Sequence, residues 1–248
     1  MTRLGCIKSP PDARDLMYHV ALAARIPPVL PRSIDYSKDM TRVRDQGNEG
    51  SCVGHAAVAM KEYQERGATR WCQKDLSERY LYEHAKEIDG MPLPHEGTTI
   101  RAAMEVLYKR GVCPESCWRY MANARLPECR DADRKAEPNR IASYVALGGV
   151  LSMRQALVSN GPFVIGVQAY SPFMDPVDGD IPLPIPSIDH YEGNHAICIV
   201  GYDDGSSRFK FKNSWGSGWG DHGYGYLGYD YMASYSFDGW LAADLVNG

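Results

Sequence analysis

The spacing of apolar residues changes at Gly161, and this change constrains the fold more than any other feature of the chain. Before Gly161, apolar side chains recur at helical spacing in four segments, residues 51–66, 75–87, 99–110 and 151–159. After it come β-like segments separated by Gly and Asp, at residues 163–169, 196–202, 208–213 and 224–229. Helices followed by strands predict an α+β protein whose two unlike halves enclose a cleft.

Two proline-rich stretches show no regular period. Residues 1–33 predict an N-terminal extension of extended backbone that lies on the surface, and residues 34–248 predict the folded domain. Residues 171–194 hold five prolines and five acidic residues but no Lys or Arg, and they predict a long ordered loop. The N-terminal extension either crosses the cleft as an inhibitory lid or packs as an arm on the back of the domain.

Composition excludes several classes of protein. The 248 residues carry a net charge of −4, whereas a protein that binds nucleic acid by neutralising phosphates carries a basic excess. No run approaches the ~18 consecutive apolar residues of a membrane-spanning helix, and no apolar leader is recognisable. We therefore expect neither a nucleic-acid nor a membrane partner. A cytoplasmic location and export without a classical signal peptide both remain open, as does the oligomeric state.

The cysteine pattern does not predict a metal site. The seven cysteines are odd in number, so at least one is free or pairs outside the chain. Cys113, Cys117 and Cys129 cluster, but their spacing matches no zinc pattern and no nearby His completes one. Free thiols and one local disulfide remain as alternatives for this cluster. We predict no metal and no cofactor.

A glycine-rich turn, Gln46 to Ser51, delivers Cys52 to the first turn of a predicted helix. The unpaired backbone N–H groups and the positive end of the helix dipole at this position favour a thiolate, which is the nucleophilic form of cysteine. A cysteine that enters a helix can equally be a small buried apolar side chain. The position alone therefore leaves a catalytic and a structural interpretation open.

Two further stretches supply partners that such a nucleophile needs. His195 opens the apolar segment that ends at Tyr202, where a lone histidine is commonly structural, but beside a thiolate it can act as general base and acid. Asn213 ends a predicted strand, and its amide can accept the second imidazole N–H and fix the ring. Trp215 can keep water away from that hydrogen bond.

Together, these three stretches resemble the papain-like cysteine peptidases. The separation of Cys52 from His195 lies within the range of that family, and the separation of Cys52 from Asn213 lies slightly beyond it. The stretch Asn-Ser-Trp-Gly-x-x-Trp-Gly, residues 213–220, is the most specific match. The resemblance runs from about Ile34 to the C-terminus. It implies a two-lobed fold, with a helical N-terminal lobe, a β-barrel-like C-terminal lobe and the active-site cleft between them.

The resemblance also implies a role for each matching residue. Cys52 corresponds to the nucleophile, His195 to the general base and acid, Asn213 to the residue that orients the histidine, and Gln46 to the oxyanion donor. Trp215 and Trp219 correspond to supporting aromatic residues, and Gly97 and Asn194 to positions that receive substrate. The implied activity is hydrolysis of peptide bonds in protein or peptide substrates through a thioester on Cys52.

Some positions depart from the family pattern. Val53 stands where the family usually has Trp or Tyr, and Glu49 stands where secreted members usually have a disulfide cysteine. The segment before the domain resembles the short leader of bacterial members, which indicates a bacterial source. Two alternatives on the same fold remain open: a transpeptidase or acyltransferase, in which an amine attacks the thioester, and a catalytically silent binding protein.

Overall fold

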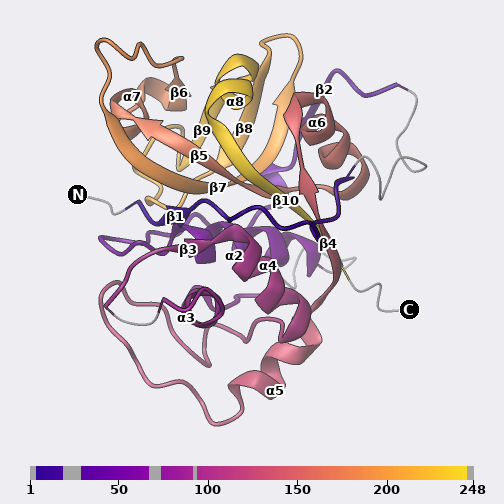
Figure 1. Ribbon diagram of the computed structural model, residues 1–248, viewed down its shortest axis with the longest axis vertical. Helices are drawn as coiled ribbons and strands as arrows, with labels where there is room; N and C mark the ends of the chain where they lie inside the picture. The colour runs from indigo at the N-terminus through magenta and orange to yellow at the C-terminus, as the bar shows by residue number, and fades with distance from the viewer. Residues whose placement is uncertain (1–3, 19–28, 67–73, 92–93, 245–248) are drawn as a thin grey trace.

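The structure is a computed structural model that describes residues 4–18, 29–66, 74–91 and 94–244. Figure 1 shows a layer of strands above a layer of helices, with the N-terminal segment running between them. The predicted α+β organisation in two unlike lobes is confirmed. Among the described residues, no helix has the length and apolar character needed to span a membrane.

The helical lobe contains α2, α3, α4 and α5, with bounds Cys52–Gln64, Glu78–Ile88, Ile100–Lys109 and Ala132–Ala136. The first three confirm predicted helices. Ser77 caps α3 by accepting a hydrogen bond from the Tyr80 N–H, and Thr99 caps α4 in the same way through Ala102. Every residue of α2 from Cys52 to Tyr63 is buried, because the helix lies between the two lobes.

The second lobe is built on an open eight-stranded sheet. Its strand order is β4-β10-β5-β7-β8-β9-β6, and β2 also pairs with β7. The bounds are β2 Ser33–Asp35, β4 Ile141–Leu147, β5 Phe163–Tyr170, β6 Asp180–Ile181, β7 Tyr191–Asp203, β8 Arg208–Lys212, β9 Tyr224–Gly228 and β10 Ser236–Asp244. Within the described ranges these strands do not close into a barrel, because β4 and β6 lie at opposite edges. The barrel-like lobe implied by the resemblance is an open sheet here.

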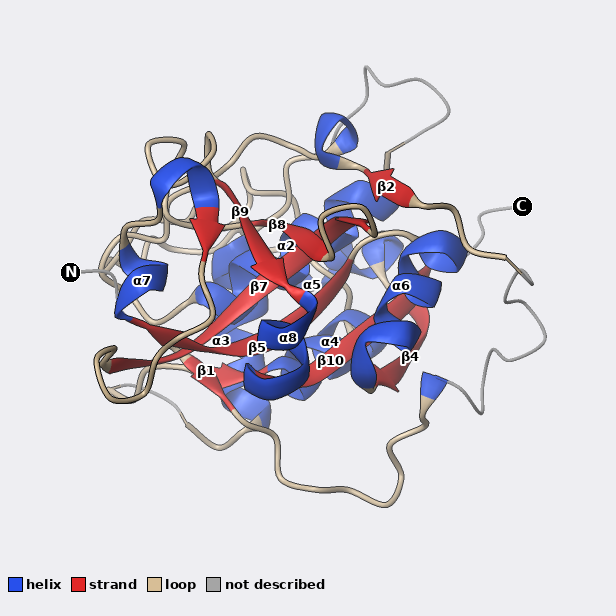
Figure 2. Cartoon of the chain, turned by 90° about the horizontal axis from the view of Figure 1, so that it is seen from above, coloured by secondary structure: helices blue, strands red, loops and turns tan. Residues whose placement is uncertain are grey.

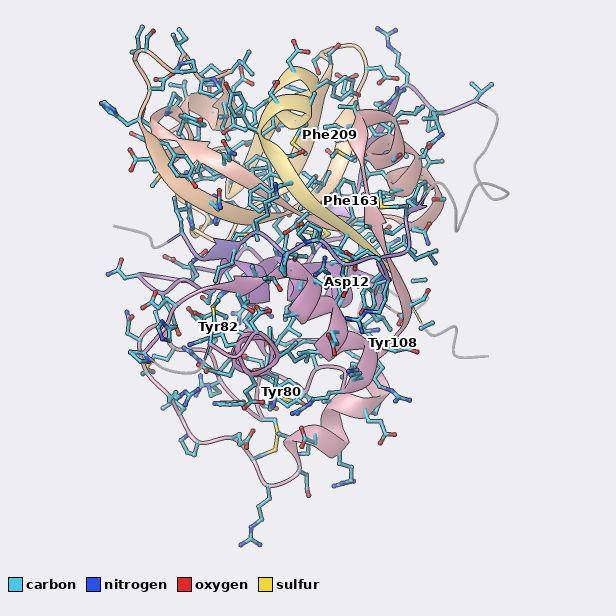
Figure 3. All side chains as sticks on the ribbon, viewed as in Figure 1. Asp12, Tyr80, Tyr82, Tyr108, Phe163 and Phe209 are labelled. Carbon is cyan, nitrogen blue, oxygen red and sulfur yellow. A yellow bond between two sulfur atoms is a disulfide. The ribbon has the colours of Figure 1, made fainter. Side chains whose placement is uncertain are left out.

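Strand alternation divides the core into two clusters on opposite faces of the sheet. Ala196, Cys198 and Val200 of β7 face the cluster that contains α2, whereas Ile197 and Ile199 face the other cluster. Figure 2 shows α6 (Gly149–Asn160) and α8 (Tyr229–Tyr235) on the side of the sheet turned away from α2. Labelled side chains mark the interior of each lobe in Figure 3: Phe163 and Phe209 above, Tyr80 and Tyr82 below.

The antiparallel register of the sheet determines where the candidate catalytic residues His195 and Asn213 lie. On β5, Val167 pairs with His195 of β7. On β8, Lys212 pairs with Cys198 of β7, so Asn213 follows the end of β8 close to the His195 end of β7. α2 packs against the same strand, β7, from the helical side. The fold therefore brings the start of α2, one end of β7 and the end of β8 together.

Some elements differ from the sequence-based expectation. The predicted loop 171–194 contains α7 (Ser171–Met174), a 3-10 turn at Val177–Gly179 and β6, and β7 already begins at Tyr191. The strands β4 and β10 have no sequence counterpart in the prediction, because each becomes a strand through its pairing with the other. Further 3-10 turns lie at Ser37–Asp39 and Glu137–Asn139.

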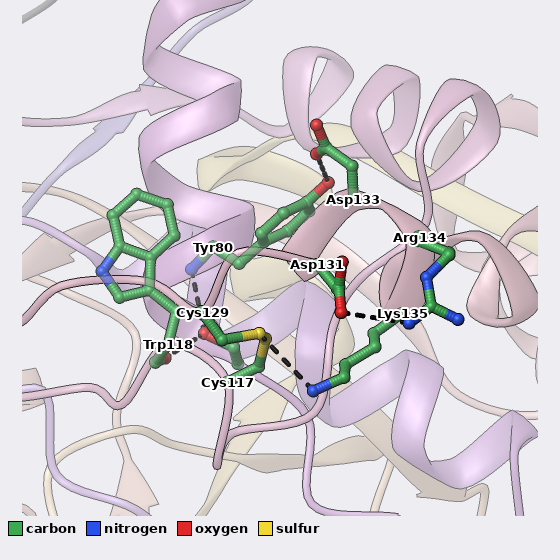
Figure 4. Close-up of a disulfide and its surroundings, with 9 residues drawn as sticks. Tyr80, Cys117, Trp118, Cys129, Asp131, Asp133, Arg134 and Lys135 are labelled. Atoms are coloured by element: carbon green, nitrogen blue, oxygen red, sulfur yellow. Dashed lines mark hydrogen bonds and ion pairs between the residues drawn. A yellow bond between two sulfur atoms is a disulfide. The ribbon is translucent and has the colours of Figure 1, made fainter.

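A disulfide joins Cys117 to Cys129 and lies beside the start of α3 (Figure 4). The Cys129 N–H also donates to the Cys117 carbonyl at 2.8 Å, so the two segments are held by backbone as well as by sulfur. Cys113 is a buried free thiol. Of the alternatives open for the cysteine cluster, the local disulfide is the one found, with Cys113 left unpaired.

Candidate active site

Cys52 is fully buried at the start of α2. The backbone N–H groups of Ala196, Gly5, Val53 and Cys52 itself face its thiol and act to lower the thiol pKa. Burial nevertheless raises the pKa of the thiol above its ordinary value, and these N–H groups oppose that rise only in part. The thiolate predicted from the helix position is therefore disfavoured in this covered form, because desolvation outweighs the helix N-terminus.

His195 is also fully buried, in β7 next to Ala196. Its Nε2 lies 2.8 Å from Oδ1 of Asn213. Since that amide oxygen can only accept, Nε2 carries the proton in the neutral ring and Nδ1 keeps its lone pair. Nδ1 has no hydrogen-bond partner among the described residues. Burial lowers the pKa of His195 to about 4, so the neutral ring prevails.

The side-chain amide of Asn213 is oriented by a second donor. The backbone N–H of Ser214 donates to Asn213 Oδ1 at 2.8 Å, which identifies this atom as the oxygen rather than the nitrogen of the amide. The backbone N–H of Asn213 donates to the Gly223 carbonyl at 2.9 Å. Asn213 is therefore held at both its backbone and its side-chain oxygen.

Aromatic rings cover the His195–Asn213 hydrogen bond. The Trp215 ring lies 4.6 Å from the His195 ring, centroid to centroid, and Trp219 meets Trp215 edge to face at 5.5 Å. Phe173 contacts His195 and both tryptophans at 5.6–5.8 Å. The sequence singled out the two tryptophans. Phe173 was not predicted as a site residue, because it belongs to the stretch predicted as a loop.

Gln46 links the turn before Cys52 to the Asn213 segment. Its Nε2 donates to the Glu49 carbonyl at 2.7 Å, and its Oε1 accepts from the Ser214 hydroxyl at 2.6 Å. The Gln46 N–H donates to the Ser214 carbonyl at 2.9 Å. These three contacts fix the position of the Gln46 side chain between the Cys52 turn and the Asn213 segment.

The two predicted substrate positions differ in their surroundings. Gly97 has a positive φ of 90°, and a Cβ there would lie 2.7 Å from the Gly5 carbonyl oxygen. Gly97 thus faces the same residue whose N–H reaches Cys52. The side chain of Asn194 accepts from the Tyr191 hydroxyl at 2.8 Å, and its backbone pairs with Gln168 in the sheet. The hydrogen bond of the Asn194 side chain therefore lies within β7.

The N-terminal segment, residues 4–9, passes between the lobes at Cys52; we call it the strap (Figure 1). In the strap, β1 (Cys6–Ile7) pairs in parallel with β3 (Thr98–Thr99), and the Thr98 N–H donates to the Gly5 carbonyl at 3.0 Å. On the sheet side, a Cβ at Gly193 would lie 2.9 Å from the Leu4 side chain, and Ser9 N–H donates to Asp238. The strap therefore touches both lobes.

Glu49 anchors the Cys52 turn to α3 through a buried ion pair that sequence reasoning missed. Its carboxylate oxygens lie 2.5 and 2.6 Å from the two terminal nitrogens of Arg79, whose side chain is 1% exposed. Arg79 also donates to Glu83 at 2.9 Å. The sequence feature that pointed to Glu49 was its position, where secreted members of the family usually have a disulfide cysteine. Its partner Arg79 could not be identified from the sequence, because the contact depends on how α3 packs.

Comparisons with known proteins agree with this arrangement. The family model of the papain family cysteine proteases matches residues 30–236. A peptidase C1-like protein of Acanthamoeba polyphaga mimivirus is 27% identical, covering 98% of this chain and 87% of that protein. Peptidase 1 of Dermatophagoides pteronyssinus is 32% identical over 77% of this chain, which spans only 58% of that protein.

A solved structure extends the likeness to the whole fold. Xylellain, a cysteine protease from Xylella fastidiosa, superposes with a TM-score of 0.86 at 26% identity, covering 98% of this chain and 97% of xylellain. Because these matches are to proteases, the acyltransferase and silent-binding alternatives are not favoured. The chain belongs to the papain family of cysteine proteases and is a cysteine-type endopeptidase.

Proposed function

We propose that Cys52 is the nucleophile of this peptidase and His195 its general base and acid, acting on protein or peptide substrates. The supporting observation is the hydrogen bond from His195 Nε2 to Asn213 Oδ1, which leaves Nδ1 as the free base on a strand whose next residue, Ala196, contacts the Cys52 sulfur. Asn213 is then a positioning residue that sets the tautomer of the ring.

The reaction follows from these atoms. Nδ1 of His195 accepts the thiol proton, and Sγ of Cys52 attacks the peptide carbonyl carbon. The resulting oxyanion is stabilised by the Cys52 N–H and by the side-chain amide of Gln46, the oxyanion donor that the family resemblance implies. The imidazolium then returns its proton to the leaving amine, and a thioester remains. A water molecule, deprotonated by His195, hydrolyses the thioester and restores the free thiol.

We further propose that the strap is an inhibitory lid. The support is steric. The Gly5 backbone lies beside the Cys52 sulfur, and the Gly5 carbonyl covers Gly97, so a substrate cannot approach either residue while the strap is in place. The active form then requires the strap to leave, which uncovers the thiol and lowers its desolvation. The likeness to xylellain over nearly the whole chain supports a bacterial-type enzyme.

The assignment of the nucleophile is tested by Cys52→Ala, with Cys113→Ala as the control because Cys113 is also a buried free thiol. Both changes are made in the Gly5→Ala protein, which we call the opened enzyme because a Cβ at Gly5 would lie 1.9 Å from the Gly50 carbonyl oxygen and should displace the strap. In the opened enzyme, hydrolysis of a quenched peptide library disappears in Cys52→Ala and persists in Cys113→Ala, while the melting temperatures stay close. Peptide cleavage retained in Cys52→Ala would show that the nucleophile lies elsewhere.

A further inference from the structure

A small cavity of about 10 Å³ lies against Asn213 at the boundary between the lobes. His55 of α2 and Glu78 of α3 reach it from the helical lobe, together with Arg44, and Asn213 and Lys212 reach it from the sheet. Its volume corresponds to one water-sized probe, so it can hold a single small ligand.

Four buried polar atoms among the lining residues have no hydrogen-bond partner in the described part of the chain: Arg44 Nε, His55 Nε2, Glu78 Oε2 and Asn213 Nδ2. Three of their residues are deeply buried, since His55, Glu78 and Asn213 are 5%, 1% and 4% exposed, and the Arg44 side chain is 15% exposed. Buried polar atoms without partners are rare because each loses its hydration without compensation. Four in one cavity indicate a ligand that satisfies them together.

The tautomer of His55 is fixed by its other nitrogen. Nδ1 lies 3.1 Å from the carbonyl oxygen of Ser51, which can only accept, so Nδ1 carries the proton. Burial lowers the pKa of His55 to about 3, which keeps the ring neutral. Nε2 therefore offers a lone pair to the cavity and acts as an acceptor.

The donor and acceptor balance identifies the ligand as uncharged. Two of the four atoms, Arg44 Nε and Asn213 Nδ2, are donors, and two, His55 Nε2 and Glu78 Oε2, are acceptors. The charges around the cavity also offset each other. Arg44 is paired with Glu78 and with Glu62, and the Lys212 ammonium donates to Thr41 at 3.0 Å and faces Glu62. This environment selects neither an anion nor a cation.

We propose that the cavity binds one water molecule, which accepts from Asn213 and Arg44 and donates to His55 and Glu78. Through this water, His55 and Glu78 are positioning residues for Asn213. The Asn213 oxygen already holds His195 and Ser214, and the water holds the nitrogen end of the same amide. The helical lobe thus orients the catalytic imidazole across the lobe boundary. This inference rests on the proposed roles of His195 and Asn213.

The test combines kinetics with a direct structural readout. His55→Phe keeps an aromatic ring but removes the acceptor, whereas His55→Gln retains an amide oxygen near the Nε2 position. In the opened enzyme we expect His55→Phe to lower kcat about 10–100-fold, the range found when a partner that orients a functional histidine is removed at metal sites. KM stays unchanged, because His55 does not contact the substrate, and His55→Gln recovers most of the rate.

The pH profile separates positioning from a loss of stability. A loosened Asn213 amide stabilises the imidazolium less, so the acidic limb of kcat shifts in His55→Phe and returns in His55→Gln. Equal kcat and equal pH profiles in folded His55→Phe and wild type would overturn the proposal.

A crystal structure of the unmodified chain at about 1.5 Å provides evidence that does not depend on activity or on the folding of a variant. A single density peak within hydrogen-bond distance of the four atoms supports the bound water. A cavity without such a peak overturns it. If Cys52→Ala remained active, the proposed function would fail, yet this crystallographic result would still stand by itself.

Discussion

The backbone N–H of Gly5 faces the thiol of Cys52 and acts to lower its pKa, so the chain's own N-terminal segment lies beside the sulfur of its peptidase site. The pKa of this thiol is raised and the pKa of His195 is lowered, and burial is the largest cause of each shift. In this form the pair is a neutral thiol and a neutral imidazole. The covered state is therefore unreactive, and the ion pair forms in an open state from which the strap has moved away.

A single methyl group at Gly5 tests the strap. A Cβ there would lie 1.9 Å from the Gly50 carbonyl oxygen, a backbone atom that cannot rotate away. Since overpacking costs roughly 1–3 kcal/mol, Gly5→Ala should displace the strap and raise the alkylation rate of Cys52 about tenfold or more. Peptide hydrolysis should rise in parallel. The readouts are peptide mass spectrometry after iodoacetamide and a fluorogenic peptide assay.

Gly228→Ala is the matched control, because no atom lies within 4 Å of a Cβ at Gly228. It should leave both rates unchanged. A folded Gly5→Ala protein whose Cys52 reacts no faster than wild type would contradict the inhibitory strap.

Acid should destabilise the covered form through its buried histidines. The pKa values of His55 and His195 are lowered to about 3 and about 4, against about 6.5 in an unfolded chain. Between pH 6.5 and 4 the unfolded state therefore binds more protons, so the free energy of unfolding falls as the pH falls. Each histidine contributes a slope of about 1.4 kcal/mol per pH unit.

Urea unfolding between pH 5 and 7 measures this slope. His55→Gln should reduce this slope by the contribution of one histidine, about 1.4 kcal/mol per pH unit. His190→Gln, which replaces an exposed side chain, is the control. Identical slopes in these two variants would show that His55 is not buried neutral in the folded protein.

The Glu49–Arg79 pair should behave as a structural anchor of the Cys52 turn. Glu49→Ala removes the bidentate partner of a buried guanidinium, which typically costs about 3 kcal/mol or more. The melting temperature should therefore fall by roughly 10 °C. Glu105→Ala, which breaks the largely exposed pair with Lys109, should change it little. Equal melting temperatures in the two variants would argue against the anchor.

The Cys117–Cys129 disulfide should make stability sensitive to reductant. Its twelve-residue separation corresponds to a contribution of roughly 3 kcal/mol to the free energy of unfolding. Urea denaturation with and without dithiothreitol should show that loss in wild type. The double variant Cys117→Ser, Cys129→Ser should be less stable than the oxidised wild type, and its stability should be the same with and without dithiothreitol. An equal free energy of unfolding of the wild type with and without dithiothreitol would mean that the disulfide does not form.

Local pattern predicted the elements that carry the site, and tertiary pairing decided the rest. The helix that begins at Cys52 and the strand that contains His195 were predictable because each combines a strong period with clear end signals. The strands β4 and β10 were not, since they depend on pairing with each other across most of the domain. The contact of Gly5 with Cys52 and that of Glu49 with Arg79 could not be predicted for the same reason, because each joins segments that are far apart in the sequence.

The most direct test of the central claim is the pH dependence of Cys52 alkylation in the Gly5→Ala protein, followed by peptide mass spectrometry from pH 4 to 9. With the strap displaced, a thiolate–imidazolium pair predicts that Cys52 stays fast to about pH 5. Cys113 and Cys198, whose pKa burial raises to about 12, should react slowly throughout this range. The wild-type protein should show slow Cys52 alkylation throughout. If Cys52 in the opened protein instead loses reactivity below about pH 8.5 like an ordinary thiol, the proposed Cys52–His195 catalytic pair is contradicted.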